Sequence, residues 1–326
     1  MITTQDSTSP VRLTIVSPSF NQGPFLAETL DSIIAQDYPH LDHIVADGGS
    51  NDETKEVLAR YEGRYALEWF SEPDNGLYDA LNKALQKTRG DWVGWINCDD
   101  LYPSGVLNAV ADTIDAHSDV NIICGDAEVF ECSNGAMRTL YTDRHYTGSR
   151  FEANDANLRI THLNACFFRK SLLDEVGSFN TDFRIIGDRD YMFRIMKLAP
   201  ASVHLGRVLC RYRAHPHSLT MSNVSEERQK PRAHDDGRIW REVEELCERY
   251  RGRDDVPPPI RTWCRTVLAR RAVNKAAADL LQGRLLHFAE SAFYALRLRT
   301  RSLVWLLLAI ARSVRKRHHL KLNSLP

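Results

Sequence analysis

Two adjacent carboxylates, Asp99 and Asp100, end an apolar segment that begins at Trp92. An apolar run of this length predicts a buried strand, and open α/β sheets bind their ligands at the carboxyl ends of the strands. Carboxylate oxygens at such a place suit a divalent cation that keeps open positions for substrate phosphates. For this stretch alone, the alternative is a strand followed by a solvated acidic turn.

Polar turns follow three earlier apolar segments in the same way. The segments are 12–16, 43–46 and 67–70, and apolar residues at helical spacing come after each turn. This alternation predicts a mostly parallel sheet with helices on both faces, and right-handed crossovers place the strand ends on one edge. We expect four groups to meet at that edge: 18–21, Asp47, Asp74 and Asp99.

The turn after the second strand contains the glycine pair Gly48 and Gly49. It is neither a dinucleotide fingerprint nor a phosphate-binding P-loop. One interpretation is a strand-to-helix turn capped by Ser50 or Asp52. In the other, Asp47 accepts hydrogen bonds from a base or ribose. Taken singly, Asp74 is more typical of a turn residue, and Phe20 of core or loop packing.

A second candidate stretch runs from 183 to 194. Asp188, Tyr191 and Met192 share one face of the predicted helix. Asp190 and Arg194 are spaced for an ion pair of about 0.2–0.5 kcal/mol. Asp188 falls near the helix start, where the free amides and the dipole favour a carboxylate, so an N-cap is one interpretation of this residue.

Composition excludes several classes of protein. The 326 residues are 43% hydrophobic and 26% charged, which is ordinary for a globular protein. The net charge of −1 gives no global case for nucleic-acid binding. Seven cysteines without a CxxC pair argue against a disulfide framework or a thiolate zinc site and fit a reducing cytosol. We expect neither a signal peptide nor a spanning helix.

The chain from residue 223 onward reads as a helical appendage. Helices are predicted at 225–251 and 260–282, and a last long helix is predicted to hold the apolar block 303–311. No Asp or Glu follows Glu290, and eight Arg and Lys lie between 297 and 321. This pattern fits a membrane-surface helix beside anionic lipid. The alternative is a helix packed on protein, with a solvated basic tail.

Four segments together resemble the nucleotide-binding half of a family-two glycosyltransferase of the GT-A fold. They are LTIVSPSFNQGPFLAETLDSIIAQDYP, IVADGGSNDET, SEPDNGLYDALNKAL and GDWVGWINCDDLYPSGVL. The resemblance covers roughly residues 11–218. It implies a glycosyltransferase domain at 1–222, with a nucleotide-binding half at about 11–101 and an acceptor half at about 102–222. A helical extension would occupy 223–326.

The resemblance assigns roles to particular residues. Asp188 matches the general base, although Gly187 stands where many relatives carry an acidic residue. Asn97 stands where many relatives carry the first Asp of Asp-x-Asp, so Asp99 and Asp100 are the expected metal pair, joined by His215. The expected nucleotide-binding residues are Pro18, Ser19, Phe20, Asp47, Asp74 and Asn97. Arg211 and Arg213 are expected to offset phosphate charge.

The acceptor half is expected to hold two further strands. They lie at 121–126 and 164–168, with 127–130 pairing onto the first. Residues 137–159 resemble the loop that shapes an acceptor pocket in the family. Tyr146, Arg150 and His162 are its candidate acceptor contacts, and a plain surface loop is the alternative.

The resemblance implies an inverting transferase that uses Mn²⁺ or Mg²⁺. It would move a sugar from a nucleotide-diphospho-sugar to a saccharide or lipid-linked saccharide, in cell-surface polysaccharide or glycolipid assembly. We expect a cytoplasmic enzyme with peripheral contact at the inner face of the cell membrane, and no nucleic-acid partner.

Three alternatives remain open. A processive synthase would carry Gln-x-x-Arg-Trp, but Gln229 to Arg232 is followed by Ala233. A sugar-nucleotide nucleotidyltransferase would carry a basic, Gly-rich loop after the first strand, and residues 18–23 contain no Lys or Arg. A non-catalytic subunit of a polysaccharide assembly complex would not need Asp99, Asp100 and Asp188 together.

Overall fold

The computed structural model describes residues 10–133, 135–144, 151, 162–219, 237–299, 302, 304, 305 and 307. The chain divides into two compact units, the first holding the described residues up to 219 and the second those from 237 onward. The domain boundary predicted at residue 222 falls in 220–236, outside the described residues.

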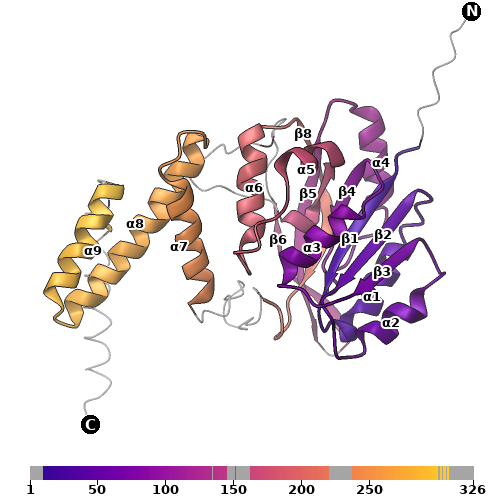
Figure 1. Cartoon of the computed structure of the whole chain (residues 1–326), viewed down its shortest axis with the longest axis horizontal. Helices are drawn as coiled ribbons and strands as arrows, with labels where there is room; N and C mark the ends of the chain where they lie inside the picture. Colours follow the sequence, from indigo (N-terminus) through magenta and orange to yellow (C-terminus); the bar gives the residue numbers. More distant parts are fainter. Residues whose placement is uncertain are drawn as a thin grey trace, which may run out of the picture. The chain divides into compact units, whose positions relative to one another are not determined.

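The first unit begins with the expected alternation of strands and helices (Figure 1). Parallel pairing places the first four strands in the order β3-β2-β1-β4. β1 continues through Ser19, because Pro18 and Ser19 still pair with β2, so these two residues do not break the strand as predicted. The elements are β1 (Leu13–Ser19), α1 (Gly23–Ile34), β2 (Leu41–Asp47), α2 (Thr54–Tyr61), β3 (Leu67–Ser71), α3 (Leu77–Gln86) and β4 (Trp92–Trp95).

The remaining strands add antiparallel pairings, so the sheet is mixed, with four parallel and three antiparallel pairings among the described strands. β7 is antiparallel to both β4 and β5, β6 is antiparallel to β5, and β8 is parallel to β5. The elements are α4 (Val106–Ala116), β5 (Ile122–Ser133), β6 (Ala136–Asp143), the 3₁₀ turn Leu163–Ala165, β7 (Cys166–Arg169), α5 (Lys170–Val176), α6 (Gly187–Leu198) and β8 (Ser202–Arg213).

Two predictions for this half are corrected. Residues 121–126 and 127–130 do not pair with each other, because both belong to the single strand β5. Residues 137–143, expected in an acceptor loop, form most of β6, which pairs along β5. Tyr146 and Arg150 lie outside the described residues. His162 is described and contacts Asp143 at 3.0 Å.

The two tryptophans of β4 connect the sheet to both of its helical layers. Trp92 belongs to the core cluster that contains Val106, Leu107 and Val110 of α4. Trp95 points to the other face, where its ring stacks on Phe168 with centroids 5.0 Å apart and meets Tyr191 of α6 at 6.4 Å. Side chains alternate across a strand, so a short buried strand fixes both layers around the turn at Asn97.

The second unit is helical. It consists of α7 (Arg238–Tyr250), α8 (Pro258–Leu281) and α9 (Leu285–Leu298), with Gly283 at a φ of 75° between the last two. The predicted helices at 225–251 and 260–282 are confirmed where they are described. α9 ends at Leu298 with Arg299 in extended backbone, and the described residues 302, 304, 305 and 307 are helical again, so a break at Arg299 divides the last predicted helix. Most of the apolar block 303–311 lies outside the described residues.

Candidate active site

The carboxyl ends of three neighbouring strands lie in register. Ser19 at the end of β1 pairs with Asp47 of β2, and Asp47 pairs with Ser71 of β3. β4 pairs with the other side of β1, and an amide-to-carbonyl hydrogen bond from Ile96 to Val16 carries that pairing one residue further. The sheet therefore brings the predicted residues of β1, β2, β3 and β4 to one edge.

Asp47 lies at the centre of this edge and is only 1% exposed. Its Oδ2 accepts hydrogen bonds from the Ser50 amide at 2.9 Å and the Ser71 hydroxyl at 2.6 Å. The Ser50 hydroxyl donates to Oδ1. Ser50 and Asp52 do not cap α2 as N-cap residues, since Glu53 holds that position. With three donors on a buried carboxylate, Asp47 fixes the Gly48–Gly49 turn, and the structure does not favour a direct bond from Asp47 to a base.

Phe20 and Asp74 are the more accessible groups beside that turn. Phe20 follows β1 directly and is 57% exposed, so it does not pack in the core. Asp74 is partly buried and its Oδ1 accepts a 2.7 Å hydrogen bond from the Gly76 amide. A Cβ atom on Gly48 would lie 2.5 Å from the Asp74 carboxylate, so glycine is required for this approach. Burial raises the pKa of Asp74.

Asp100 is fully buried and acts as a hydrogen-bond hub. Its Oδ2 accepts from Asn164 Nδ2 at 2.7 Å and Asn97 Nδ2 at 3.2 Å, and its Oδ1 accepts from the Arg213 amide at 2.8 Å. Burial, reinforced by the charge of Asp99, raises the pKa of Asp100 well above its usual range. These contacts connect β4, the turn before β7 and the end of β8, and they turn the carboxylate away from any solvent-facing ligand.

Asp99 and His215 form a pair at the same turn, in which Asp99 is partly exposed and His215 is buried. Asp99 Oδ2 lies 3.0 Å from His215 Nε2, and the Asp99 side chain is 16% exposed. The pair forms because Leu101 and Arg211 exchange two backbone hydrogen bonds, which align the segment after Asp100 with the end of β8. His215 Nδ1 is buried and has no hydrogen-bond partner in the described structure.

Arg213 is a structural residue rather than a phosphate contact. It is 3% exposed and its guanidinium donates to the Asp99 carbonyl at 2.8 Å and to Glu28 of α1 at 2.8 Å. Arg211 is paired with Glu128 at 2.9 Å. Both guanidinium groups are therefore engaged with protein acceptors.

Asp188 lies in the first turn of α6. It is not the N-cap, which is Ile186, but its Oδ1 accepts a 2.7 Å hydrogen bond from the Arg189 amide. The residue keeps a solvent-exposed surface, yet the protein around it displaces water and raises its pKa, as the desolvated carboxylate favours its neutral form. The predicted Asp190–Arg194 ion pair is confirmed at 3.0 Å.

Two residues of α3 position the segment that carries Asp188, and the helical periodicity of α3 did not single them out. The Tyr78 hydroxyl donates to the Ile185 carbonyl at 2.9 Å and lies 3.5 Å from Asp188 Oδ1. Asn82 exchanges two hydrogen bonds with the backbone of Phe179, at 2.8 and 3.0 Å. The only sign in the sequence was that Tyr78 and Asn82 carry polar atoms one turn apart on an amphipathic helix. Their hydrogen-bond partners could not be read from it, because they lie about a hundred residues away in sequence.

Tyr78 also explains why residue 187 is glycine. A Cβ atom at Gly187 would lie 2.7 Å from the Tyr78 ring, so an acidic side chain at this position has no room.

We expect Gly187→Ala to displace the Tyr78 ring or the start of α6 and to lower kcat more than it raises KM for the donor. Gly252→Ala is the matched control, since no atom lies within 4 Å of a Cβ there. Unchanged kcat in Gly187→Ala would contradict the packing argument.

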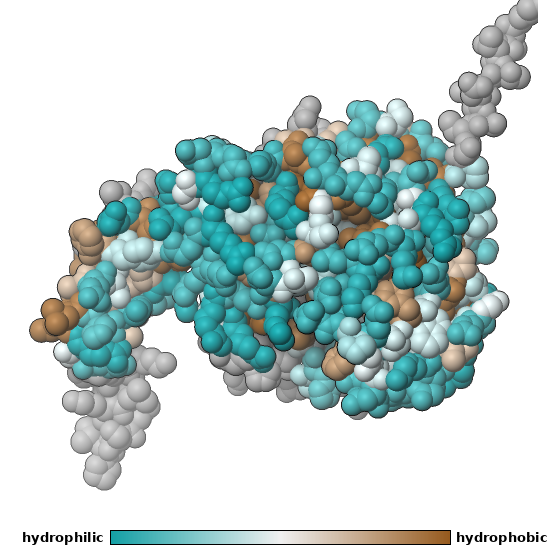
Figure 2. Space-filling view, in the orientation of Figure 1, coloured by the Kyte–Doolittle hydropathy of each residue, from teal (hydrophilic) through white to brown (hydrophobic). Residues whose placement is uncertain are grey.

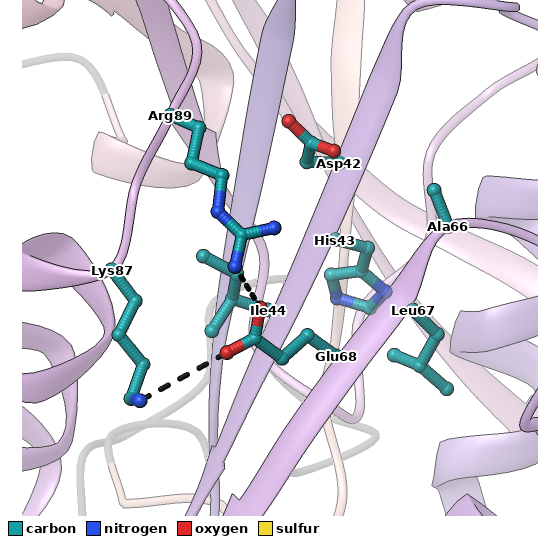
Figure 3. Close-up of a pocket in the computed structure, with 8 residues that line it drawn as sticks. All are labelled: Asp42, His43, Ile44, Ala66, Leu67, Glu68, Lys87 and Arg89. Carbon is teal, nitrogen blue, oxygen red and sulfur yellow. Dashed lines mark hydrogen bonds and ion pairs between the residues drawn. The ribbon is translucent and has the colours of Figure 1, made fainter.

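A separate depression lies on the face of β2 and β3, away from this edge (Figure 3). It has a volume of about 220 Å³ and is lined by Asp42, His43, Ile44, Ala66, Leu67, Glu68, Lys87 and Arg89. Glu68 forms ion pairs with Arg89 at 2.9 Å and with Lys87 at 3.9 Å. The His43 ring is hydrogen-bonded to the hydroxyl groups of Ser17 and Tyr65. Because its charged groups are already paired, we assign it no ligand.

The sequence matches one family model and several curated proteins. The family model described as glycosyl transferase family 2 matches residues 14–177. An uncharacterized glycosyltransferase of Mycobacterium tuberculosis is 32% identical over 209 residues, which cover 63% of this chain and 76% of the relative. A PGL/p-HBAD biosynthesis glycosyltransferase of Mycobacterium bovis is 28% identical over 187 residues, which cover 55% of this chain and 68% of that relative.

Solved structures share the fold at low sequence identity. S. aureus TarS 1–349 in complex with UDP-GlcNAc has a TM-score of 0.59 and 16% identity, covering 89% of this chain and 82% of that one. The full TarS chain is matched over 43% of its length. The mannosyltransferase PcManGT of Pyrobaculum calidifontis, in complex with GDP-Man and Mn²⁺, has a TM-score of 0.52 and 19% identity, covering 91% and 88%. These neighbours are glycosyltransferases of the GT-A fold.

Proposed function

The chain belongs to glycosyl transferase family 2 and is a glycosyltransferase, and we propose that it is an inverting enzyme. It would transfer a sugar from a nucleotide-diphospho-sugar to an acceptor hydroxyl. The observation that carries this proposal is the Asp99–His215 pair, 3.0 Å apart at the carboxyl edge of the sheet. The family match ends at residue 177 and does not reach Asp188 and His215, so their proposed roles rest on the motif resemblance given above together with the contacts of the two residues.

A divalent cation fits the Asp99–His215 pair. Carboxylate oxygen and imidazole nitrogen both suit Mn²⁺, with Mg²⁺ as the harder alternative. In the described part of the chain no group of three or more His, Cys, Asp or Glu could hold a metal. Two protein ligands are nonetheless typical of a cation whose remaining positions go to substrate phosphates. When bound, the cation would supply charge to offset the departing diphosphate. Asp100 would hold Asp99 in place instead of coordinating directly.

Asp188 is the proposed general base. Its carboxylate would accept the proton of the acceptor hydroxyl while the acceptor oxygen forms a bond to the anomeric carbon. The bond from that carbon to the diphosphate breaks, and the nucleoside diphosphate leaves from the opposite face. A single displacement of this kind inverts the anomeric configuration. A raised pKa suits a general base that works near neutral pH. The carboxylate then has a higher affinity for the proton it must accept, while it is still ionised before the reaction.

The nucleoside would lie over the ends of β1, β2 and β3. The exposed ring of Phe20 offers a stacking surface, and Asp74 offers a polar contact beside Gly48. Pro18, Ser19 and Asp47 would shape this surface through the strand ends and the turn. Asn97 would act through Asp100, to which its amide donates.

The acceptor proposed here is a saccharide or a lipid-linked saccharide in cell-surface polysaccharide or glycolipid assembly. The seven free cysteines fit a reducing compartment, and a cytoplasmic enzyme in peripheral contact with the inner face of the cell membrane would meet such an acceptor. No helix of the described residues is long and apolar enough to cross a membrane.

Slow donor hydrolysis tests this proposal without knowledge of the acceptor. UDP-, GDP-, dTDP- and CDP-sugars would each be incubated with the protein and Mn²⁺, with EDTA as the control. We expect release of one nucleoside diphosphate that depends on Mn²⁺, and NMR of the freed sugar should show inverted anomeric configuration. Release with retained configuration would contradict inversion. Absence of release from the whole panel would count against donor use.

A further inference from the structure

The two units of the chain carry opposite charge. Residues 237–326 contain nineteen Arg and Lys against eight Asp and Glu, whereas residues 1–236 contain twenty-three against thirty-five. The overall net charge of −1 conceals this division. A charge asymmetry of this kind favours contact between the basic unit and an anionic surface.

Helix α9 buries one side and exposes the other. Ser291 and Ala295 are buried, and Ala295 packs with Ala276 and Ala277 of α8. On the other side, Leu286 is 80% exposed and Phe293 is 64% exposed, and their spacing of seven residues puts them on the same helical face. Figure 2 shows hydrophobic residues gathered at the end of this unit where α8 and α9 meet.

Two further apolar residues are exposed after α9 in sequence. Val304 is 59% exposed and Leu307 is 62% exposed. Trp305, between them in sequence, packs against the cluster of α8 and α9, with the guanidinium groups of Arg270 and Arg299 at 5.0 and 5.7 Å from its ring centroid. Large exposed apolar residues on one helical face mark interaction surfaces, and on α9 the guanidinium of Arg297 lies 6.0 Å from the ring centroid of exposed Phe293.

We propose that the outer face of α9, together with the exposed residues Val304 and Leu307, docks on the surface of an anionic lipid bilayer. The apolar side chains would enter the boundary between headgroups and acyl chains, as amphipathic helices do. Arg297, beside Phe293 on this face, would contact an anionic headgroup and add to the attraction.

Charge decides between lipid and a second copy of the chain as the occupant. Pairing of two α9 outer faces would bring together two units that each carry nineteen Arg and Lys against eight Asp and Glu, so the two copies would repel each other. An anionic bilayer offers an apolar layer for the exposed side chains of α9 and negative charge for the basic unit. The proposal does not depend on glycosyl transfer, so its failure and the failure of the proposed function can be told apart.

Co-sedimentation of the full chain with lipid vesicles tests the proposal. Vesicles of phosphatidylcholine alone would be compared with vesicles that also contain phosphatidylglycerol. We expect binding to the anionic vesicles only, and weaker binding as salt concentration rises. The double variant Leu286→Ser, Phe293→Ser should bind at least roughly tenfold more weakly, because it removes two apolar side chains from the contact with the bilayer.

Two further variants sharpen the result. Glu290 lies on the outer face between Leu286 and Phe293, so Glu290→Lys should strengthen binding roughly tenfold. Met137→Ser removes an apolar residue that is 43% exposed in the other unit and should change nothing. Absence of binding to anionic vesicles overturns the proposal. So does a double variant that binds normally, or one that instead converts a dimer to a monomer in sedimentation analysis.

Discussion

Asp188→Asn should lower kcat for glycosyl transfer by about 10²–10⁴-fold, the usual contribution of a general base. The amide keeps the shape of the carboxylate and can still accept from the Arg189 amide, but it cannot take a proton from the acceptor. Donor binding should be unchanged, because the hydrogen-bond partners of Asp188 are Arg189 and Tyr78, and neither lies in the ends of β1, β2 and β3 that would hold the nucleotide. Steady-state kinetics and nucleotide titration together check both halves of this prediction.

The same substitution should stabilise the fold. The pKa of Asp188 is raised in the folded state, so as pH rises the unfolded chain loses this proton first and the folded state loses stability. Asparagine does not ionise, so the variant does not lose stability in this way. The difference in Tm between Asp188→Asn and the wild type should therefore be absent at acidic pH, below the unfolded pKa, and positive at neutral pH.

A carboxylate on another helix provides the control. Asp112 of α4 is exposed, so Asp112→Asn should leave kcat unchanged. If Asp188→Asn kept full activity, Asp188 would not be the base. If it were destabilised at neutral pH by as much as a core substitution, the carboxylate would be a structural residue of α6.

Asp100→Ala should produce the largest loss of stability among the site residues. It leaves the amides of Asn97 and Asn164 and the backbone amide of Arg213 without their acceptor in a fully buried place. Each buried donor left unpaired costs about 1–3 kcal/mol. We expect the free energy of unfolding to fall by about 3 kcal/mol or more, and each kcal/mol lowers Tm by about 2–4 °C in a domain of this size.

The neighbouring carboxylate serves as the comparison. Asp99→Ala removes one hydrogen bond from a partly exposed side chain, so Tm should fall by much less. Asp100→Asn keeps one acceptor oxygen and should lie between the two. Thermal unfolding of the three variants at one pH orders them, and an equal Tm for Asp99→Ala and Asp100→Ala would refute the division of roles.

Much of the sheet edge could be predicted from the sequence, because it depends on local patterns. Apolar runs such as 92–96 and the turns after them determine where strands end, and parallel pairing then aligns those ends. The prediction was weaker where pairing is between distant segments. Nothing in residues 121–130 distinguishes one long strand from a hairpin, and β6 forms in a polar segment because it pairs along β5.

Roles within the site were less predictable, because they depend on which acceptors are buried. Asp99 and Asp100 are adjacent and identical in type, but the end of β8 covers one and leaves the other beside His215. Arg213 has the residue type of a phosphate contact, yet Glu28, more than a hundred residues earlier, takes its charge. The roles of Tyr78 and Asn82 likewise became visible only from contacts across the chain.

Nucleotide binding tests the central claim most directly, since it needs no acceptor. Thermal unfolding of the wild type and of Asp99→Ala would be followed with UDP, GDP, dTDP and CDP, each with and without Mn²⁺. A nucleotide at about 100 times its dissociation constant adds about 2.7 kcal/mol of stability. We predict that one nucleotide stabilises the wild type only with Mn²⁺, and that Asp99→Ala loses this effect. Equal stabilisation of Asp99→Ala, or none by any nucleotide, would contradict the metal-dependent site described above.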